Sequence, residues 1–429
     1  MKLSGWGKYP ALRARADAPA DVDVLRVILR DGFSGIARGL GRSYGDASLA
    51  ARVILTRNFN RLISFDAKAG VVRCGGGVRL GGLLARIVPA GWFPAVVPGT
   101  RDVTVGGCVA ADIHGKNHHR VGSFANHVRS LTVMLPDGEV VTGSREERPD
   151  LFRATCGGMG LTGVILEAEF DLVPVKSVLM RETRLRAPDL AGMFACLEAH
   201  RGATYSVAWL DAMPGRTFGR AVIHLGEHAE AGALRWTEPF APSVPPGFPG
   251  FLLNRVSVAA FNRVRYNGTR EGDRLAGLDE FFFPLDALRN WNRLYGRRGF
   301  LQYQFVAPKA AGRGAVAAVF DAIKRSGRGA YLAVLKEFGA GNGNPLSFPM
   351  EGWTLALDFP RRPGLMEFLE EADRIVGDFG GRVYLAKDAR MGREAFRRGY
   401  PAWEAFVAAR EKSGAARVFR SLLSDRLGI

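Results

Sequence analysis

Glycine is concentrated in three short segments of the first 175 residues: Gly39–Gly45, Pro98–Gly107 and Gly157–Gly163. The chain has 54 glycines in 429 residues, well above the usual share of about 7%, and they follow no collagen-like period. Because glycine has no side chain, such segments let the backbone approach another group closely. A fold that uses this composition needs several tight turns around one bound or buried group.

The known nucleotide-binding motifs do not match these segments. Gly39 and Gly41 are followed by Gly45, which gives G-x-G-x-x-x-G instead of the dinucleotide fingerprint G-x-G-x-x-G. A P-loop is absent as well. Glycine turns can nevertheless aim several backbone N–H groups at one anion. Three such turns joined by short strands favour a dinucleotide held mainly by backbone.

Membrane-spanning and secreted proteins are disfavoured by the hydrophobic pattern. The longest apolar runs, such as Tyr331–Leu335, are far shorter than the roughly 20 residues of a spanning helix. Lys2, Ser4 and Gly5 follow Met1 without an apolar stretch or a cleavage site, so no classical signal peptide is expected. The sequence therefore predicts a cytoplasmic protein.

The four cysteines are Cys74, Cys108, Cys156 and Cys196. Their wide spacing, with no C-x-x-C pair, argues against a disulfide scaffold or a zinc ribbon and favours reduced thiols. Cys108 and Cys156 adjoin glycine segments, where we expect them to be small buried packing residues.

The net charge is +17, from 59 Lys plus Arg against 42 Asp plus Glu. The densest basic stretch runs from Arg263 to Arg298. It fits an anionic substrate, an anionic membrane surface or a nucleic acid, and equally an arginine-rich solvated surface. No aromatic-interleaved basic motif of an RNA or DNA module is present. A polyanion-binding protein is therefore only a remote alternative, and no nucleic-acid partner is expected.

Hydrophobic periodicity predicts a mixed α+β chain. A helix is expected over residues 21–29, capped by Asp21, and a hairpin turn at Pro136–Gly138. Residues 1–175 read as short strands and helices between glycine turns, and the following 200 residues alternate strands with helices. Phe300–Val306 alternates apolar and polar residues, which places Gln302 and Gln304 on one face of a strand.

Several segments, in order over nearly the whole chain, resemble the vanillyl-alcohol-oxidase (PCMH-type) flavoproteins, and most closely their decaprenylphosphoryl-β-D-ribose oxidase branch. The segments are RGLGRSYGD (Arg38–Asp46), PGTRDVTVGG (Pro98–Gly107), ADIHGKNHH (Ala111–His119), GGMGLTG (Gly157–Gly163), GFLQYQF (Gly299–Phe305), PLSFPMEGW (Pro345–Trp353) and YLAKD (Tyr384–Asp388).

The resemblance implies an α+β fold with three parts. Residues 1–175 would form a two-subdomain PCMH-type FAD-binding domain, and residues 176–383 a substrate-binding cap domain with an antiparallel sheet. Residues 384–429 would return to the FAD domain.

The resemblance also implies the cofactor and the residues that hold it. Many relatives carry a histidine in the first glycine loop that bonds covalently to the flavin. The matching residue here is Arg42, whose guanidinium offers no nucleophilic nitrogen, so non-covalent FAD is expected. The implied cofactor-binding residues are Ala37, Arg38, Gly39, Leu40, Gly41, Arg42, Ser43, Tyr44, Gly45, Asp46, Ala47, Gly99, Thr104, Val105, Gly106, Gly107, Ala111, Asp112, Ile113, His114, Val164, Ile165 and Tyr384.

Lys387 and His114 are the catalytic residues that the resemblance implies. A lysine near the reactive edge of a flavin stabilises its anionic reduced form; without the resemblance, Lys387 could equally be a surface lysine. His114, His118 and His119 lie close together, which leaves three readings: a metal site, structural histidines or a flavin-site role. Lys116 would repel a metal cation and no thiol lies nearby, so no metal is expected.

Six residues are expected at the substrate: Lys116, Trp209, Gln302, Gln304, Thr354 and Ala356. The glutamine amides would hydrogen-bond sugar hydroxyls, although both could instead face solvent on an amphipathic strand, and Trp209 could be a core residue. Thr354 and Ala356 stand where the branch it resembles carries an Asn and a Cys. That departure leaves the identity of the substrate open.

The predicted protein is an FAD-dependent oxidoreductase that oxidises a secondary hydroxyl of a sugar. The resemblance implies the 2′-hydroxyl of a polyprenylphosphoryl-β-D-ribose, the first half of an epimerisation to arabinose in cell-wall arabinan synthesis. It further implies a separate NAD(P)H-dependent reductase as partner and peripheral contact with the inner face of the membrane. A soluble aldonolactone or alditol oxidase of the same superfamily is the alternative.

Overall fold

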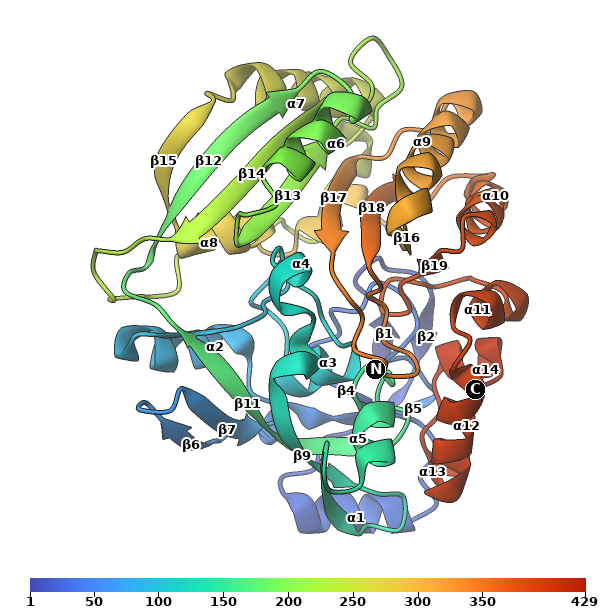
Figure 1. The fold of residues 1–429 in the computed structure, drawn as a ribbon. Helices are drawn as coiled ribbons and strands as arrows, with labels where there is room; N and C mark the ends of the chain where they lie inside the picture. The colour runs from blue at the N-terminus through green and yellow to red at the C-terminus, as the bar shows by residue number, and fades with distance from the viewer.

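The computed structural model describes all residues from Met1 to Ile429. It contains four sheets, of eight, six, three and two strands, together with fourteen helices. The eight-stranded sheet lies above the N-terminal half in Figure 1, and the C-terminal helices run along one side. The α+β class predicted from the sequence is confirmed.

The N-terminal half holds a parallel sheet ordered β3-β5-β4 and an antiparallel sheet ordered β10-β9-β11-β7-β6, with β8 paired to β11. A small sheet joins β1 and β2. The strands are β1 (Lys2–Ser4), β2 (Ala11–Arg13), β3 (Arg15–Asp17), β4 (Ile36–Arg38), β5 (Arg52–Leu55), β6 (Leu62–Asp66), β7 (Val71–Gly75), β8 (Trp92–Pro94), β9 (Val128–Met134), β10 (Val140–Ser144) and β11 (Val164–Pro174). The helices are α1 (Val22–Arg30), α2 (Leu80–Ile87), α3 (Val105–Ala110), α4 (His118–Val121) and α5 (Pro149–Thr155).

Local sequence explains several of these boundaries. Asp21 caps α1 as predicted, because its carboxylate accepts a hydrogen bond from the N–H of Val24 at 2.9 Å. The predicted hairpin joins β9 to β10 around Gly138, whose φ of 85° suits glycine. Cys108 and Cys156 are buried packing residues, also as predicted.

The eight-stranded sheet is antiparallel and ordered β15-β12-β14-β13-β17-β18-β16-β19. Its strands are β12 (Leu179–Ala187), β13 (Tyr205–Leu210), β14 (Ala221–His228), β15 (Gly272–Gly277), β16 (Phe300–Pro308), β17 (Leu332–Phe338), β18 (Gly352–Pro360) and β19 (Arg382–Val383). The helices of this part are α6 (Leu190–Ala199), α7 (Arg255–Gly268), α8 (Leu278–Phe282), α9 (Lys309–Ser326) and α10 (Leu365–Asp378).

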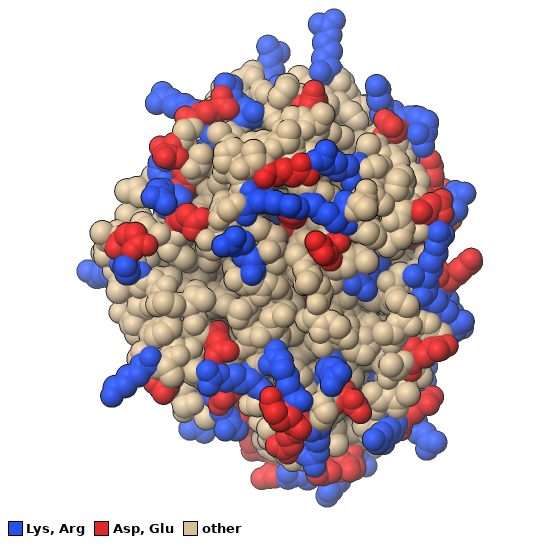
Figure 2. Space-filling model, in the orientation of Figure 1, with Lys and Arg blue, Asp and Glu red and all other residues tan.

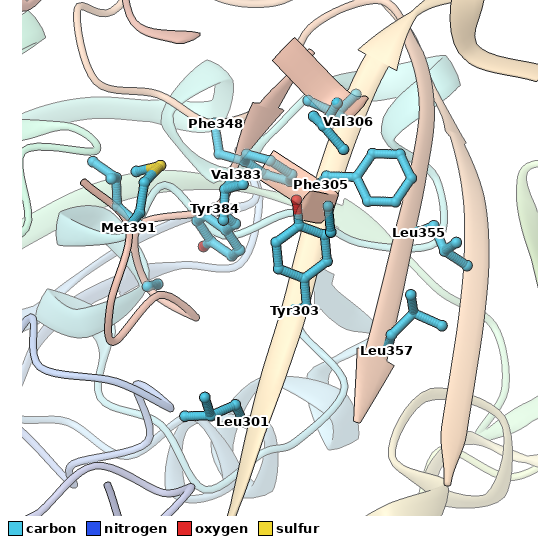
Figure 3. Packing of buried hydrophobic residues seen from close by; sticks show 14 of the residues in the cluster. Leu301, Tyr303, Phe305, Val306, Phe348, Leu355, Leu357, Val383, Tyr384 and Met391 are labelled. Atoms are coloured by element: carbon cyan, nitrogen blue, oxygen red, sulfur yellow. The ribbon is translucent and has the colours of Figure 1, made fainter. Parts of the chain in front are cut away.

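One face of this sheet forms the largest hydrophobic core. Leu301, Tyr303 and Phe305 of β16 belong to one cluster with Leu355 and Leu357 of β18, as Figure 3 shows. Residues of α6, α9 and α10 complete the cluster. Because side chains alternate along a strand, the residues between these positions face the other side, toward the N-terminal half.

The C-terminal segment packs back onto the N-terminal half. It comprises α11 (Arg393–Gly399), α12 (Trp403–Lys412), α13 (Ala415–Val418) and α14 (Leu422–Leu427). Arg410 is fully buried and donates to the carbonyl of Leu161 at 2.9 Å. The N–H of Arg420 donates to the carbonyl of Gly35 at 2.7 Å. These contacts tie the tail to the strands and turns of the first half.

Basic and acidic side chains are interspersed over the face drawn in Figure 2. Many arginines are paired: Arg274 contacts Glu182 and Glu280, and Arg289 contacts Glu238. Much of the net positive charge is therefore distributed over a mixed surface. Across the chain, no helix combines the length and the apolar character that crossing a bilayer requires.

Candidate flavin and substrate site

A deep cavity lies between the N-terminal half and the inner face of the eight-stranded sheet. All three glycine-rich turns contribute to its wall, through residues such as Gly41, Gly99 and Gly160. The opposite wall comes from β16, β17 and β18, and the segment around Lys387 closes one side. The cavity thus combines a backbone-rich wall with a wall of side chains.

The first glycine turn leaves its backbone N–H groups without a protein acceptor. None of the N–H groups of residues 39–43 donates to another protein group. Gly41 has a φ of 65°, a conformation that glycine adopts without strain. Successive N–H groups that lack a protein acceptor and face a cavity are the defining feature of an anion nest.

Arg42 borders this nest and is held in place by the second glycine turn. Its Nε donates to the carbonyl of Asp102 at 2.9 Å, and its second nitrogen contacts the Asp102 carboxylate at 3.1 Å. The guanidinium also stacks over Trp6, 4.1 Å from the ring centroid. Arg42 therefore places a fixed positive charge at the wall.

Gly45 ends the first turn where the C-terminal segment crosses it. A Cβ at this position would lie 1.6 Å from the carbonyl oxygen of Asp388, so no larger residue fits. Arg426 of α14 pairs with both Asp46 and Asp388, at 2.9 Å and 2.8 Å. These two carboxylates are anchored by one arginine, which locks the Tyr384–Asp388 segment against the glycine turn.

The opposite wall follows from strand register. Gln302 pairs with Asp358, Gln304 with Ala356, and Lys336 with Thr354. Gln302, Gln304, Lys336 and Ala356 line the cavity. Gln302 and Gln304 are buried, with 9% and 3% of their surface exposed, so the alternative of a solvent-facing amphipathic strand is wrong.

His114 links the two walls. Its Nε2 lies 3.0 Å from the Gln304 amide nitrogen, and its Nδ1 lies 3.0 Å from Nζ of Lys336. Burial, followed by the charges of Lys336, His118 and Lys387, holds the pKa of His114 well below its usual range. A neutral imidazole that accepts at Nε2 carries its proton at Nδ1.

A neutral Lys336 would accept from the Nδ1–H of His114, whereas a charged Lys336 would donate to Nδ1 and place the His114 proton at Nε2. Burial, aided by the charges of Lys116 and Lys387, lowers the pKa of Lys336 to about 7. The amide of Gln304 also donates to Oγ1 of Thr354 at 3.2 Å, which fixes the amide orientation. Thr354, Gln304, His114 and Lys336 therefore form one connected hydrogen-bond network.

Lys387 lines the cavity next to Tyr44. Its Nζ lies 3.7 Å from the centroid of the Tyr44 ring, and it donates to no acceptor in the protein. Burial lowers the pKa of Lys387 to about 7, an effect opposed by the charge of Asp358. Burial likewise raises the pKa of Asp358 to about 7, opposed by the hydrogen bond from Gln302 and by Lys387.

Most of the predicted cofactor-binding residues lie in the cavity wall. Gly45, Asp46, Val105, Asp112 and Val164 are not among the lining residues. Asp112 is fully buried and accepts from Oγ of Ser123 at 2.9 Å, the N–H of Ala125 at 2.9 Å and the amide of Asn342 at 2.6 Å. Its side chain supports the wall from behind.

Two predicted substrate residues point elsewhere. Nζ of Lys116 donates to the carbonyl of Phe281, and the lysine lies outside the cavity lining. Trp209 is buried beneath Arg265 of α7, 5.1 Å from the ring centroid. Thr354 lies behind Gln304, and of the two departures from the resembled branch only Ala356 reaches the cavity.

The neighbouring histidines also have structural partners. His118 accepts from the N–H of Gly339 at 3.2 Å through Nδ1 and stacks on Phe338. Nε2 of His119 lies 2.9 Å from the carbonyl of Ala203.

The sequence analysis missed Lys336, which lines the cavity, and Asp358, which holds Gln302 from outside the lining. Asp358 lies two residues beyond Ala356 in β18, a strand that the resemblance had already brought to attention. In Leu332–Phe338, Lys336 and Glu337 interrupt a run of apolar residues, and a buried lysine needs a polar partner.

Other missed residues lie at the opposite end of the cavity. The segment Leu285–Trp291 contributes Asp286, Arg289 and Trp291 to the lining. The Asp286 carboxylate accepts from Oγ1 of Thr100 at 2.6 Å and from the N–H of Arg101 at 2.8 Å. The second glycine turn is thereby tied to this segment.

The residues of this cavity fit FAD. The N–H groups of residues 39–43 would supply donors for a pyrophosphate, and a Cβ at Gly106 would lie 2.9 Å from the carbonyl oxygen of Gly76. At Gly39 a Cβ would lie 2.2 Å from Oγ1 of Thr104. Tyr384, His114 and Lys387 supply a stacking ring, an imidazole and a cation beyond the nest.

Comparison with known proteins agrees with this geometry. Residues 10–144 match the FAD binding domain family. The chain is 38% identical to the decaprenylphosphoryl-β-D-ribose oxidase of Mycolicibacterium smegmatis, over 99% of this chain and 97% of that protein. An uncharacterised protein of Streptomyces coelicolor is 35% identical over 80% of this chain and 98% of its own length. A putative D-arabinono-1,4-lactone oxidase of Neurospora crassa is 30% identical over only 33% of this chain and 25% of that protein.

The fold and the cavity define an FAD-dependent oxidoreductase with a PCMH-type FAD-binding domain. The chain belongs to the oxidoreductase family that contains the mycobacterial decaprenylphosphoryl-β-D-ribose oxidase. The relationship to lactone oxidases is more distant and is limited to a third of the chain.

Proposed function

We propose that this enzyme oxidises the 2′-hydroxyl of a polyprenylphosphoryl-β-D-ribose. The observation that carries the proposal is the 38% sequence identity to decaprenylphosphoryl-β-D-ribose oxidase, which extends over 99% of the chain. The aligned region includes the strands of the substrate wall. Bound FAD supplies the acceptor for the hydride that leaves the carbinol carbon. Everything else must come from the cavity residues.

The substrate wall suits a polyhydroxylated ring. The amides of Gln302 and Gln304 carry donors and acceptors for hydroxyl groups, and both line the cavity. Each amide is held by a second contact, to Asp358 at 2.5 Å and to Thr354 at 3.2 Å. Pre-positioned amides favour a sugar over a simple apolar alcohol.

Lys387 and Lys336 have different roles in the proposed reaction. Lys387, which lacks a protein acceptor, supplies the positive charge that stabilises the reduced cofactor. To accept the hydroxyl proton at Nζ, neutral Lys336, with a pKa of about 7, must turn its lone pair from His114 Nδ1 to the substrate. His114 positions Lys336 through Nδ1 at 3.0 Å.

We further propose that FAD is bound without a covalent link. Arg42 occupies the position in the first turn where a histidine would be required, and Asp102 and Trp6 hold its guanidinium. Release of all the yellow colour on acid precipitation tests this. Colour that stays with the pellet would contradict it.

Anaerobic reduction of the bound flavin tests the substrate assignment. The purified enzyme in detergent micelles is mixed with polyprenylphosphoryl-β-D-ribose, its arabinose epimer, D-arabinono-1,4-lactone or an alditol. We expect the ribose lipid to bleach the flavin and to yield a keto product that has lost two hydrogens. Bleaching by the lactone or alditol but not by either lipid would overturn the proposal and favour a soluble aldonolactone or alditol oxidase.

The proposed reaction also implies a partner enzyme. Completion of an epimerisation requires reduction of the keto product, and we propose a separate NAD(P)H-dependent reductase for that step. Adding such a reductase to a reaction that has stopped at the keto product should yield the arabinose epimer.

A further inference from the structure

Residues 239–270 form a segment of unusual composition. It contains no aspartate or glutamate, and its four charged residues are all arginines: Arg255, Arg263, Arg265 and Arg270. It is also rich in large apolar residues. The segment comprises the proline-rich loop that precedes α7, the helix itself and the two residues after it.

Helix α7 is amphipathic, but both of its faces are partly apolar. Val258 and Asn262 are buried against the sheet, where the amide of Asn262 donates to Asp211 at 2.7 Å. On the outer side, Val256, Ala260 and Val264 follow one another at intervals of four residues, which places them in one stripe. Val256 is 79% exposed and Val264 is 71% exposed.

The exposed apolar residues of the protein gather in this region. Of the 13 large hydrophobic residues that are exposed, seven lie between positions 240 and 275. They are Phe240, Phe251, Leu252, Val256, Phe261, Val264 and Leu275. A concentration of this kind marks an interaction surface, since single exposed apolar residues are otherwise scattered.

Unpaired arginines accompany these residues. Arg255, Arg263 and Arg270 are exposed and form no ion pair. Arg297 and Arg298 are likewise exposed, and they follow Gly296, which packs against Gly250. Unpaired arginines also occur elsewhere on the surface, as at Arg374 and Arg417, but here they accompany the exposed apolar residues and residues 239–270 contain no carboxylate.

The segment is attached to the wall of the proposed flavin cavity. The N–H of Val244 donates to the carbonyl of Arg289 at 2.9 Å, and the N–H of Arg289 donates to Pro242 at 2.8 Å. The amide of Asn290 donates to Oγ of Ser243 at 2.9 Å. Arg289 and Asn290 line the cavity, so the loop that leads into α7 is joined directly to the cavity wall.

We propose that this docking surface, formed by Phe251, Leu252, Val256, Phe261 and Val264 with Arg255, Arg263 and Arg270, binds an anionic lipid bilayer. The inference deepens the proposed function, on which its biological meaning rests. An amphipathic helix that presents apolar side chains beside arginines lies flat at the boundary between headgroups and acyl chains. The lipid tail of the substrate then remains in the bilayer while its sugar reaches the cavity.

The charge of the surface distinguishes a bilayer from a second copy of the chain. A symmetric dimer through this surface would bring the same arginines of two protomers together, and no carboxylate of residues 239–270 could pair with them. An anionic bilayer supplies the complementary charge, and each arginine near such a surface strengthens binding by roughly fivefold.

Vesicle sedimentation without substrate tests the docking surface. The flavin-loaded protein is incubated with vesicles of phosphatidylcholine alone or of phosphatidylcholine with phosphatidylglycerol. We expect binding to the anionic vesicles that weakens as salt is raised. The triple substitution Val256→Glu, Phe261→Glu and Val264→Glu should weaken it roughly a hundredfold or more. Arg255→Gln with Arg263→Gln should weaken it roughly 25-fold.

The apolar controls come from α1, which lies at the opposite end of the molecule in Figure 1. Val24 and Val27 of α1 are exposed apolar residues, and Val24→Glu with Val27→Glu should leave vesicle binding unchanged. Arg374→Gln and Arg417→Gln, on α10 and α13, control for the loss of charge. Retained flavin absorbance shows that each variant is folded.

Three outcomes overturn the proposal. The first is equal binding to neutral and anionic vesicles. The second is an equal loss of vesicle binding in the α1 control variant. The third is a dimer in sedimentation velocity that depends on the docking-surface residues and forms without vesicle binding. Because no turnover is measured, failure here leaves the substrate assignment intact. Conversely, vesicle binding with no flavin reduction by the ribose lipid would sustain the docking surface and reject the proposed function.

Discussion

The two walls of the cavity recognise their ligands by opposite means. The wall of the N-terminal half presents backbone N–H groups from residues 39–43, and its shape depends on glycines that exclude side chains. The wall of the eight-stranded sheet presents Gln302, Gln304 and Lys336 from strands whose pairing fixes their positions. The first wall suits a cofactor bound through backbone groups, and the second suits a substrate contacted by side chains.

The difference extends to charge. The first wall holds permanently charged arginines such as Arg42, which is paired with Asp102. The second holds groups whose charge varies near neutral pH, since burial brings the pKa values of Lys336, Lys387 and Asp358 to about 7. We propose that FAD binding depends on the first wall, that proton transfer depends on the second wall, and that Lys387 stabilises the charge of the reduced cofactor.

Replacing Lys387 by methionine is the strongest test of that division. Lys387→Met should leave FAD bound, because the backbone nest is intact, and should slow flavin reduction roughly 10²- to 10³-fold, the typical effect of removing one electrostatic stabiliser. Anaerobic stopped-flow reduction measures it. Lys324→Met, at an exposed position of α9, is the control, and an unchanged rate in Lys387→Met would remove this lysine from the mechanism.

Gly45→Ala tests the backbone wall. The new Cβ would meet the carbonyl of Asp388 at 1.6 Å, so the Tyr384–Asp388 segment must move away from the glycine turn. We expect a loss of about 3 kcal/mol of stability, the upper end of typical overpacking effects, with reduced FAD content. Urea unfolding and the flavin-to-protein absorbance ratio measure the two effects.

Gly82→Ala controls for the loss of a glycine as such. Nothing lies within 4 Å of a Cβ at that position of α2, and alanine is the better helix former there. If Gly45→Ala and Gly82→Ala have the same stability and the same flavin-to-protein ratio, the close approach of Gly45 to Asp388 is not required for folding or FAD binding.

More residues of the first wall than of the second could be predicted from the sequence. The glycine turns are contiguous segments, so their motifs describe the local geometry that forms the nest. Gln302 and Gln304 were accessible too, because alternation along one strand places both on one face.

Residues that depend on pairing between distant strands were not accessible in the same way. Lys336 reaches His114 only because β17 lies between β13 and β18, an order that no local pattern encodes. Trp209 was expected at the sugar, but α7 covers it with Arg265. Lys116 was expected there too, and it turns instead to the carbonyl of Phe281.

The pH dependence of stability provides a finer test of the second wall. The pKa of Lys336 is lowered to about 7 in the folded protein, against about 10.4 for an unfolded lysine. Between these values the unfolded chain binds more protons than the folded chain, so this lysine makes stability rise with pH from about 7 to about 10. One such group contributes a slope of at most about 1.4 kcal/mol per pH unit, and less where the cavity admits water.

Lys336→Met should therefore stabilise the FAD-free protein near neutral pH and flatten the rise of its urea midpoint at alkaline pH. Asp358→Asn acts in the other window. The pKa of Asp358 is raised to about 7, so its wild-type contribution to stability is lost as pH rises from about 4 to about 7. The control Lys324→Met should leave the pH dependence of stability unchanged in both ranges. If Lys336→Met shows the wild-type slope, Lys336 remains charged in the folded protein, and the proton on His114 lies at Nε2 instead of Nδ1.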